Sequence, residues 1–138
     1  MSMVPAPSAP SARPKWVIWT ARVLSALPVL LMLFSASLKL RHAPDFVEAW
    51  VKVFGFQEST LTAIGLVELA CAILYAVPRT SVLGAVLMTG YLGGAIVTHV
   101  RLGQPDFLTP LVLGVIAWAG IWLRDPRLPE LLPLRKTR

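Results

Sequence analysis

The sequence predicts an all-α membrane protein, a transmembrane four-helix bundle with a short amphipathic helix between the first and second spans. Hydrophobic residues make up 56% of the 138 residues and charged residues only 14%, whereas about a quarter of a soluble domain is charged. The apolar residues form long runs, and the basic residues stand at the ends of those runs, where lipid headgroups would lie. Because an open segment in lipid satisfies its own backbone only as a helix, each run is predicted to be helical.

Four runs approach the roughly 20 apolar residues that a spanning helix needs. They define a transmembrane domain over 15–124, with predicted spans at about 16–40, 59–77, 81–101 and 106–124. Residues 1–14 are rich in Pro, Ser and Ala and are predicted to be a disordered tail. Residues 125–138 are predicted to be a basic tail.

The first run has an alternative interpretation. Its apolar core at 23–34, followed by Ser35-Ala36-Ser37, also fits a cleaved signal peptide. We favour a span because the apolar stretch extends back to Trp16. A stripe at spacings of three and four also predicts a buried packing face, made of Ser25, Pro28, Met32, Ser35 and Lys39.

The segment between the first two runs is amphipathic. Apolar side chains recur at helical spacing from Phe46 to Phe54, and Glu48 and Lys52 form an i, i+4 pair. We expect a short helix that lies in the interface or caps the bundle. Tight connections are predicted at 78–80 and 102–107, where Pro and Gly interrupt the apolar pattern.

The basic residues also predict the orientation. With four spans both termini share one side, which holds nine of the 13 Lys and Arg, and the other side holds Lys39, Arg41, Lys52 and Arg101. The positive-inside rule therefore places both termini in the cytoplasm. Because the net charge of +6 sits at the ends of apolar runs, it predicts contact with a lipid bilayer and no binding of nucleic acid.

Glu68 is a carboxylate near the middle of the second run. It lies about seven residues into the predicted helix, roughly 10 Å from the non-cytoplasmic end. An ionised carboxylate in hydrocarbon costs several kcal/mol or more, so Glu68 must be protonated, paired or facing a wet cavity.

Several polar groups are predicted to lie in the same leaflet as Glu68. Lys39 ends the first run, His99 ends the third, and Tyr91 lies within the third. We predict a polar pocket between the first three spans in which Glu68 and His99 hydrogen-bond a ligand, Tyr91 orients it and Lys39 tunes the charge. The alternative is structural: a Glu–Lys or Glu–His pair can simply fix helix register. In that case Lys39 could snorkel and His99 could cap its helix, and we expect Arg101 to be an interface anchor.

Gly90 and Gly94 make a GxxxG pattern in the third run, which lets helices approach closely. We expect packing within the bundle, and a homodimer seam is the alternative. Gly65 and Ala72 flank Glu68 on its face and predict a close helix contact there.

Most catalytic motifs are missing from the sequence. It has no P-loop, no HExxH, and a single cysteine, Cys71, so it predicts no metal site and assigns no catalytic residue. A haem would need His42 and His99 in one place, which their positions disfavour. We expect no enzyme activity from the chain alone and at most a role as a subunit of a redox complex.

Four stretches together resemble the DoxX-like family of small four-helix membrane proteins. They are FSASLKL at 34–40, IGLVELACAIL at 64–74, PRTSVLGAVLMTGYLGGAIVTHVRLG at 78–103 and WLRDPRLPELLPLR at 122–135. The resemblance implies a bacterial inner-membrane bundle and, by analogy with a subunit linked to quinone-dependent thiosulfate oxidation, a redox partner in the membrane. Relatives that act as assembly chaperones or cargo receptors imply a binding role without catalysis.

The sequence thus leaves two hypotheses. In the first, the chain is a small membrane subunit that binds a lipophilic ligand, for which a quinone is one candidate, or a partner protein in a pocket around Glu68. In the second, it is a structural or chaperone-like protein whose polar cluster only fixes helix packing.

Overall fold

The computed structural model describes residues 13–128, and every regular element within them is helical. The long helices are α1 (Lys15–Leu40), α3 (Thr60–Ala76), α4 (Ser81–Arg101) and α5 (Leu108–Arg124). Shorter elements are α2 (Pro44–Glu48), the π-helical turn η1 (Ala49–Val53) and the 3₁₀ turn η2 (Pro105–Phe107). Apart from residues 13–14 and 125–128, the predicted tails lie outside the described residues.

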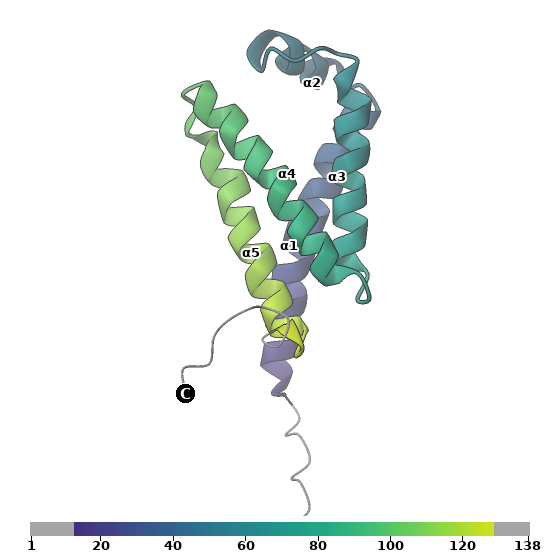
Figure 1. Cartoon of the computed structure of the whole chain (residues 1–138), viewed down its shortest axis with the longest axis vertical. Coiled ribbons are helices and arrows are strands. Elements are labelled where there is room, and N and C mark those ends of the chain that lie inside the picture. Colours follow the sequence, from purple (N-terminus) through teal and green to yellow (C-terminus); the bar gives the residue numbers. More distant parts are fainter. Residues whose placement is uncertain (1–12, 129–138) are drawn as a thin grey trace, which may run out of the picture.

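The long helices pack in a ring. Helix α1 packs against α3 and α5, and α4 packs against the same two helices from the opposite corner. The helices converge where α1 begins and α5 ends, and they diverge toward the other end, where α2 and η1 lie across the top (Figure 1). The bundle is therefore closed at one end and splayed at the other.

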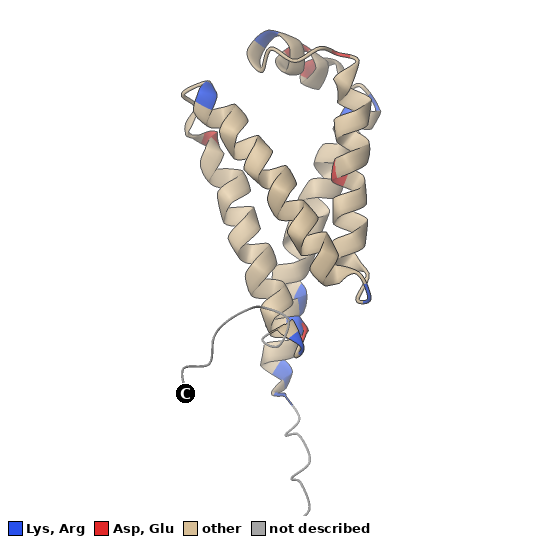
Figure 2. Cartoon of the chain, in the orientation of Figure 1, with Lys and Arg blue, Asp and Glu red and all other residues tan. Residues whose placement is uncertain are grey.

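The outside of the bundle is apolar, as a lipid-facing surface must be. Large hydrophobic side chains point outward along the helices, with Trp16 70%, Val97 66% and Val115 65% exposed. Lys and Arg gather near the helix ends, and the helical shafts are nearly free of them (Figure 2). The chain is a membrane protein, and the prediction of an all-helical fold is confirmed.

Three helical segments are long and apolar enough to cross a membrane: Lys15–Leu40, Ser81–Arg101 and Pro105–Arg124. Helix α3 is as apolar but has only 17 residues, which is the lower limit for a span. Three of the predicted spans are thus confirmed as helices of sufficient length, and the crossing by α3 stays a prediction.

Small residues hold the convergent end together. A Cβ added to Gly84 would lie 2.2 Å from the backbone nitrogen of Tyr75, and one added to Gly120 would lie 2.8 Å from Ser25 Oγ. These glycines bring α4 onto α3 and α5 onto α1. The hydroxyl of the buried Tyr75 then donates across the ring to the Ala117 carbonyl, 2.6 Å away, and joins α3 to α5.

Gly90 and Gly94 do not make the helix contact that we expected. A Cβ on either would meet no atom within 4 Å, and both face a cavity. The expectation of close packing within the bundle is wrong because α4 has already diverged from α3 at this level (Figure 1). A homodimer through these glycines stays a prediction.

The predicted amphipathic helix is present as α2 continued by η1. Lys52 Nζ lies 2.8 Å from Glu48 Oε1 in the expected i, i+4 pair. Trp50 is 8% exposed on the inner side, and its indole N–H donates to Thr60 Oγ1 over 3.2 Å. The segment therefore covers the splayed end of the bundle.

We predict that Gly84→Ala destabilises the protein. The added methyl would overlap the backbone of α3 at Tyr75, so the two helices must separate at a cost of about 1–3 kcal/mol. The free energy of unfolding in mixed detergent micelles measures the loss. Gly93→Ala is the matched control, because a Cβ there meets nothing within 4 Å and alanine favours the helix by up to about 1 kcal/mol. Equal effects of the two substitutions would contradict the packing described for Gly84.

Candidate functional site

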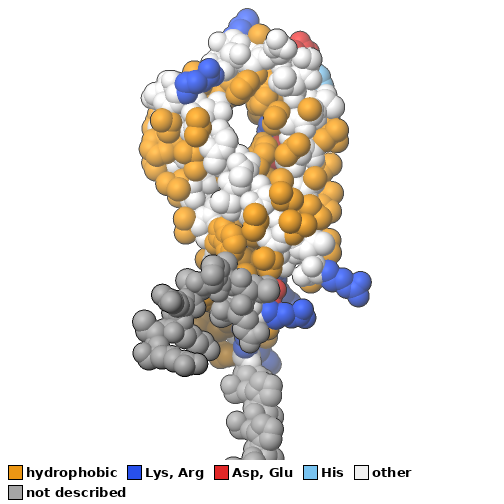
Figure 3. Space-filling view, viewed as in Figure 1, with side chains coloured by type: hydrophobic (Ala, Val, Ile, Leu, Met, Phe, Trp, Pro, Cys, Tyr) orange, Lys and Arg blue, Asp and Glu red, His pale blue; other side chains and the backbone are white. Residues whose placement is uncertain are grey.

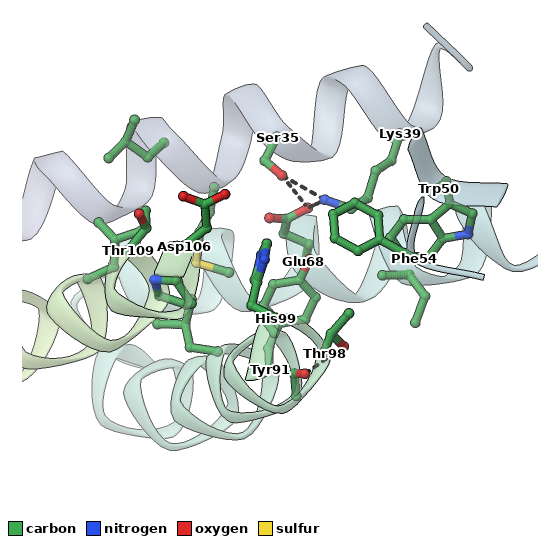
Figure 4. Close-up of a pocket in the computed structure, with 18 of the residues that line it drawn as sticks. Ser35, Lys39, Trp50, Phe54, Glu68, Tyr91, Thr98, His99, Asp106 and Thr109 are labelled. Atoms are coloured by element: carbon green, nitrogen blue, oxygen red, sulfur yellow. Dashed lines mark hydrogen bonds and ion pairs between the residues drawn. The ribbon is translucent and has the colours of Figure 1, made fainter. Parts of the chain in front are cut away.

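A buried ion pair joins α1 to α3 in the splayed half. Lys39 Nζ donates to Glu68 Oε2 over 2.8 Å, and the two side chains are 5% and 4% exposed. Nζ also donates to Ser35 Oγ at 2.6 Å, and the Ser35 hydroxyl donates to the same carboxylate oxygen at 3.3 Å. The three groups form a closed polar triangle (Figure 4).

Local sequence places these groups together. Ser35 precedes Lys39 by one helical turn, so both side chains lie on the face of α1 that meets α3. Gly65 stands one turn before Glu68, and a Cβ there would lie 3.0 Å from the Cβ of Lys39. The predicted close contact at Gly65 is therefore confirmed, and it lets the lysine stem cross to α3.

The ammonium group of Lys39 is compensated on all sides. Beyond its two hydrogen bonds, Nζ stands 4.9 Å from the ring centroid of Phe46 on α2, a cation–π distance. Glu68 lies eight residues after the first residue of α3, about 12 Å along the helix. A pair at that depth must be neutralised within the protein, because lipid offers no partner.

A cavity of about 750 Å³ lies beside the ion pair. All four long helices line it, together with α2, η1 and the segments that follow η1 and α4, and most of its wall is apolar. The space-filling view shows a hollow in the splayed half, bordered by hydrophobic side chains at the top and right and by white atoms elsewhere, with acidic and basic atoms in its wall (Figure 3). The hollow is open on this side face of the bundle, between α3 and α4 (Figures 1 and 3).

The four predicted ligand-binding residues all line this cavity: Lys39, Glu68, Tyr91 and His99. Lys39 is the partner of Glu68 and does not snorkel, since it is 4% exposed. Tyr91 extends from α4 toward Glu68 (Figure 4). Whether these residues bind a ligand stays a prediction, but the pocket that would hold one exists.

His99 does not pair with Glu68, contrary to one of our expectations. Its Nδ1 lies 3.0 Å from Gln104 Oε1, and its ring meets the Phe54 ring edge-on with centroids 5.5 Å apart. The chain turns back after α4, so Gln104 becomes the nearer polar partner. His99 therefore lines the cavity from the α4 side, opposite the ion pair.

An aromatic cap closes the splayed end. We use this name for Phe46, Trp50, Phe54 and Phe56, whose neighbouring rings have centroids 4.7–6.2 Å apart. Arg101 fastens the cap to α4, because its guanidinium donates to the Phe54 carbonyl and lies 5.9 Å from the Phe56 ring centroid. Arg101 is thus more than the interface anchor that we expected.

Two further polar residues of the cavity escaped sequence analysis. Asp106 in η2 and Thr109 in α5 both line it and stand on the wall across from Lys39 (Figure 4). In the sequence, the segment that contains Asp106 predicts only a turn. In the structure, the 3₁₀ geometry of η2 determines the direction of the carboxylate. The one sequence feature that could have pointed to Asp106 as a cavity residue is its position directly before an apolar run.

Comparison with known proteins gives a family and nothing finer. A model of the DoxX-like family matches residues 23–120, which is more than half of the 138-residue chain. No curated protein and no solved structure matches. The matched segment contains the ion pair, Tyr91 and His99.

We predict that Lys39 and Glu68 are coupled in stability. Lys39→Met leaves a buried carboxylate without its partner and should lower the free energy of unfolding by about 3 kcal/mol. Lys39→Met combined with Glu68→Met should restore most of that loss, since an apolar pair needs no compensation. A double-mutant cycle by unfolding in mixed micelles measures the coupling, and additive effects would show that the pair is energetically idle.

Proposed function

The chain belongs to the DoxX-like family, and from that premise we propose that it is a small integral-membrane subunit that binds a lipophilic ligand in the cavity beside Lys39 and Glu68. The supporting observation is a hollow that is open to the side of the bundle, with apolar walls and a few convergent polar groups (Figures 3 and 4). Ligand sites in proteins have this composition.

The position of the opening argues for a ligand that arrives through the membrane. The aromatic cap and Arg101 cover the end of the bundle, whereas the opening between α3 and α4 faces the bilayer in the proposed orientation (Figure 1). The volume of about 750 Å³ suits a ring or headgroup with part of a chain, since small-molecule sites span about 300–1,000 Å³. A quinone is one candidate, and a partner subunit would then complete any redox role.

The proposal includes the membrane topology. We propose that α3 crosses the membrane as a fourth span, that both termini are cytoplasmic and that the membrane is a bacterial inner membrane. The close packing of α3 with α1 and α4 supports the fourth crossing. The placement of the basic residues supports the orientation.

A structural role is the second candidate, and one observation favours it. Lys39 finds its hydrogen-bond acceptors within the protein, at Glu68 and Ser35, so the ion pair can be explained as the contact that holds α1 to α3. Such a protein would need the pair for stability and would keep its function with the cavity filled.

We predict that Gly94→Leu abolishes ligand binding without loss of stability. A Cβ at Gly94 meets nothing within 4 Å and points into the cavity, so the leucine fills ligand space without a clash. Binding of a decyl-tailed benzoquinol to the purified protein in detergent should weaken by about tenfold or more, equivalent to 1.4 kcal/mol. Native mass spectrometry of protein extracted gently from its own membrane should show any co-purifying lipophile in wild type only.

Gly93→Leu is the control for this experiment. Gly93 lies on the same helix, also has nothing within 4 Å of an added Cβ, and does not line the cavity. The two variants share their gain in helix propensity and differ in where the leucine points. The structural role would be favoured if wild type carries no bound lipophile and binds the probe no better than Gly94→Leu does.

We predict that the two ends of α3 lie on opposite sides of the membrane. Lys52 and Arg79 are exposed residues that flank α3, so Lys52→Cys and Arg79→Cys in a Cys71→Ala background report the crossing. A membrane-impermeant maleimide should label position 52 in intact spheroplasts and position 79 only after lysis. Labelling of both from one side would rule out a span at α3.

A further inference from the structure

Resting on the proposed function, we propose that the cavity selects lipophilic ligands whose polar head donates hydrogen bonds and discriminates against heads that only accept them. The relevant chemistry is that of a hydroxyl group on a ring or chain. The observation behind it is a difference between the donors and the acceptors of the cavity wall. Most side-chain donors have partners in the protein, whereas the hydrogen bonds from α1 to Glu68 all end on Oε2 and leave its other carboxylate oxygen toward the cavity.

The strongest donor of the wall is occupied. Two hydrogens of the Lys39 ammonium are directed to Ser35 Oγ and Glu68 Oε2, and the face of the Phe46 ring lies 4.9 Å away. A ligand carbonyl could take one of these hydrogens only by breaking the buried ion pair. Lys39 therefore has no free hydrogen to offer an acceptor, and its role in tuning charge stays a prediction.

The other donors are engaged in the same way. The Ser35 hydroxyl donates to Glu68 at 3.3 Å, the Thr98 hydroxyl to the Gly94 carbonyl at 2.9 Å, and the Trp50 indole to Thr60 at 3.2 Å. Among the cavity-lining residues that the structure describes, Thr109 has a hydroxyl with no hydrogen bond to the protein, and it lies beside Asp106 (Figure 4). A hydroxyl also accepts, so Thr109 suits either kind of head.

The acceptors are open to the cavity. Both hydrogen bonds to Glu68 from α1 end on Oε2, and the second carboxylate oxygen is directed away from Lys39 (Figure 4). Asp106 presents another carboxylate from η2 across the cavity. An ionised carboxylate only accepts hydrogen bonds, so both walls of the cavity favour a ligand head that donates one.

Tyr91 and His99 add to this bias. The Tyr91 side chain comes toward Glu68 (Figure 4), and because the carboxylate attracts the phenolic hydrogen, the phenolic oxygen is left as an acceptor. His99 Nδ1 faces Gln104 Oε1, and the tautomer that this contact favours leaves Nε2 as an acceptor. With Lys39 and Glu68 cancelling, the remaining formal charge of the lining is that of Asp106.

The physical consequence is selectivity. A hydroxyl head gains a hydrogen bond to a charged acceptor, whereas an ether or carbonyl head places its lone pairs against those of the wall and leaves both sides unpaired. The difference is larger at Glu68, which is 3% exposed, than at the exposed Asp106, because solvent does not rescue unpaired groups that are buried.

A matched pair of probes tests this directly. We expect 4-nonylphenol to bind the purified full-length protein about tenfold or more tightly than 4-nonylanisole, with each affinity measured by calorimetry against the blocked Gly94→Leu variant to remove partition into detergent. The two probes differ at one position, where the hydrogen that the phenol donates is replaced by a methyl group in the anisole. Equal affinities, or tighter binding of the anisole, overturn the inference while leaving a lipophile site in place.

The outcomes separate this inference from the proposed function. If neither probe binds wild type better than Gly94→Leu, both are overturned together. If the inference holds, Lys39→Met with Glu68→Met should reduce the advantage of the phenol, because phenol binding loses a charged acceptor and anisole binding loses an unfavourable lone-pair contact. Asp106→Asn provides a second variant at an exposed position, and its amide, which also donates, should narrow the ratio between the probes. An unchanged ratio in both variants contradicts the assignment of these acceptors.

Discussion

The structure depends on the burial of one charge pair in an apolar medium. Glu68 lies about 12 Å along α3 from the first residue of that helix, and Lys39 Nζ is 2.8 Å from its carboxylate. Neither group could remain ionised alone in lipid. Their contact sets the rotation of α1 and α3 about their own axes and brings Ser35 into the same cluster. That wall of the cavity is therefore specified by electrostatics, since the surrounding lipid provides no hydrophobic force between helices.

The cavity arises from an unequal distribution of small residues along the helices. Gly84 and Gly120 let the backbones touch at the convergent end, whereas Gly90 and Gly94 meet no neighbour at the splayed end. Gly65 holds α1 and α3 together beside the ion pair. The helix pairs α1–α3 and α4–α5 thus separate above a tightly packed base, and the aromatic cap with Arg101 bridges them at the top (Figure 1).

The arrangement of base, cap and side opening determines from which direction a molecule can reach the cavity. A base packed around Tyr75, Met88 and Ile121, each fully buried, blocks passage toward the end where α1 begins. A cap of stacked rings covers the opposite end. The hollow between them is open to the side (Figure 3), so a molecule dissolved in the bilayer could reach Glu68 more directly than one dissolved in water. The ion pair is both a structural contact and part of the chemistry that such a molecule would meet.

By itself, the sequence determined the helical class, the outward apolar surface and the need of Glu68 for a partner, because these follow from local hydropathy and from the energy of a charge in lipid. It also limited the partners to Lys39, His99 and Tyr91 through their depth along the helices. Only the tertiary structure decided among them: Lys39 crosses at Gly65, and His99 turns to Gln104. Helix rotation, splay and loop geometry depend on contacts between segments that are distant in the sequence. Hydrophobic periodicity therefore could not predict that Gly90, Gly94 and Asp106 face the cavity.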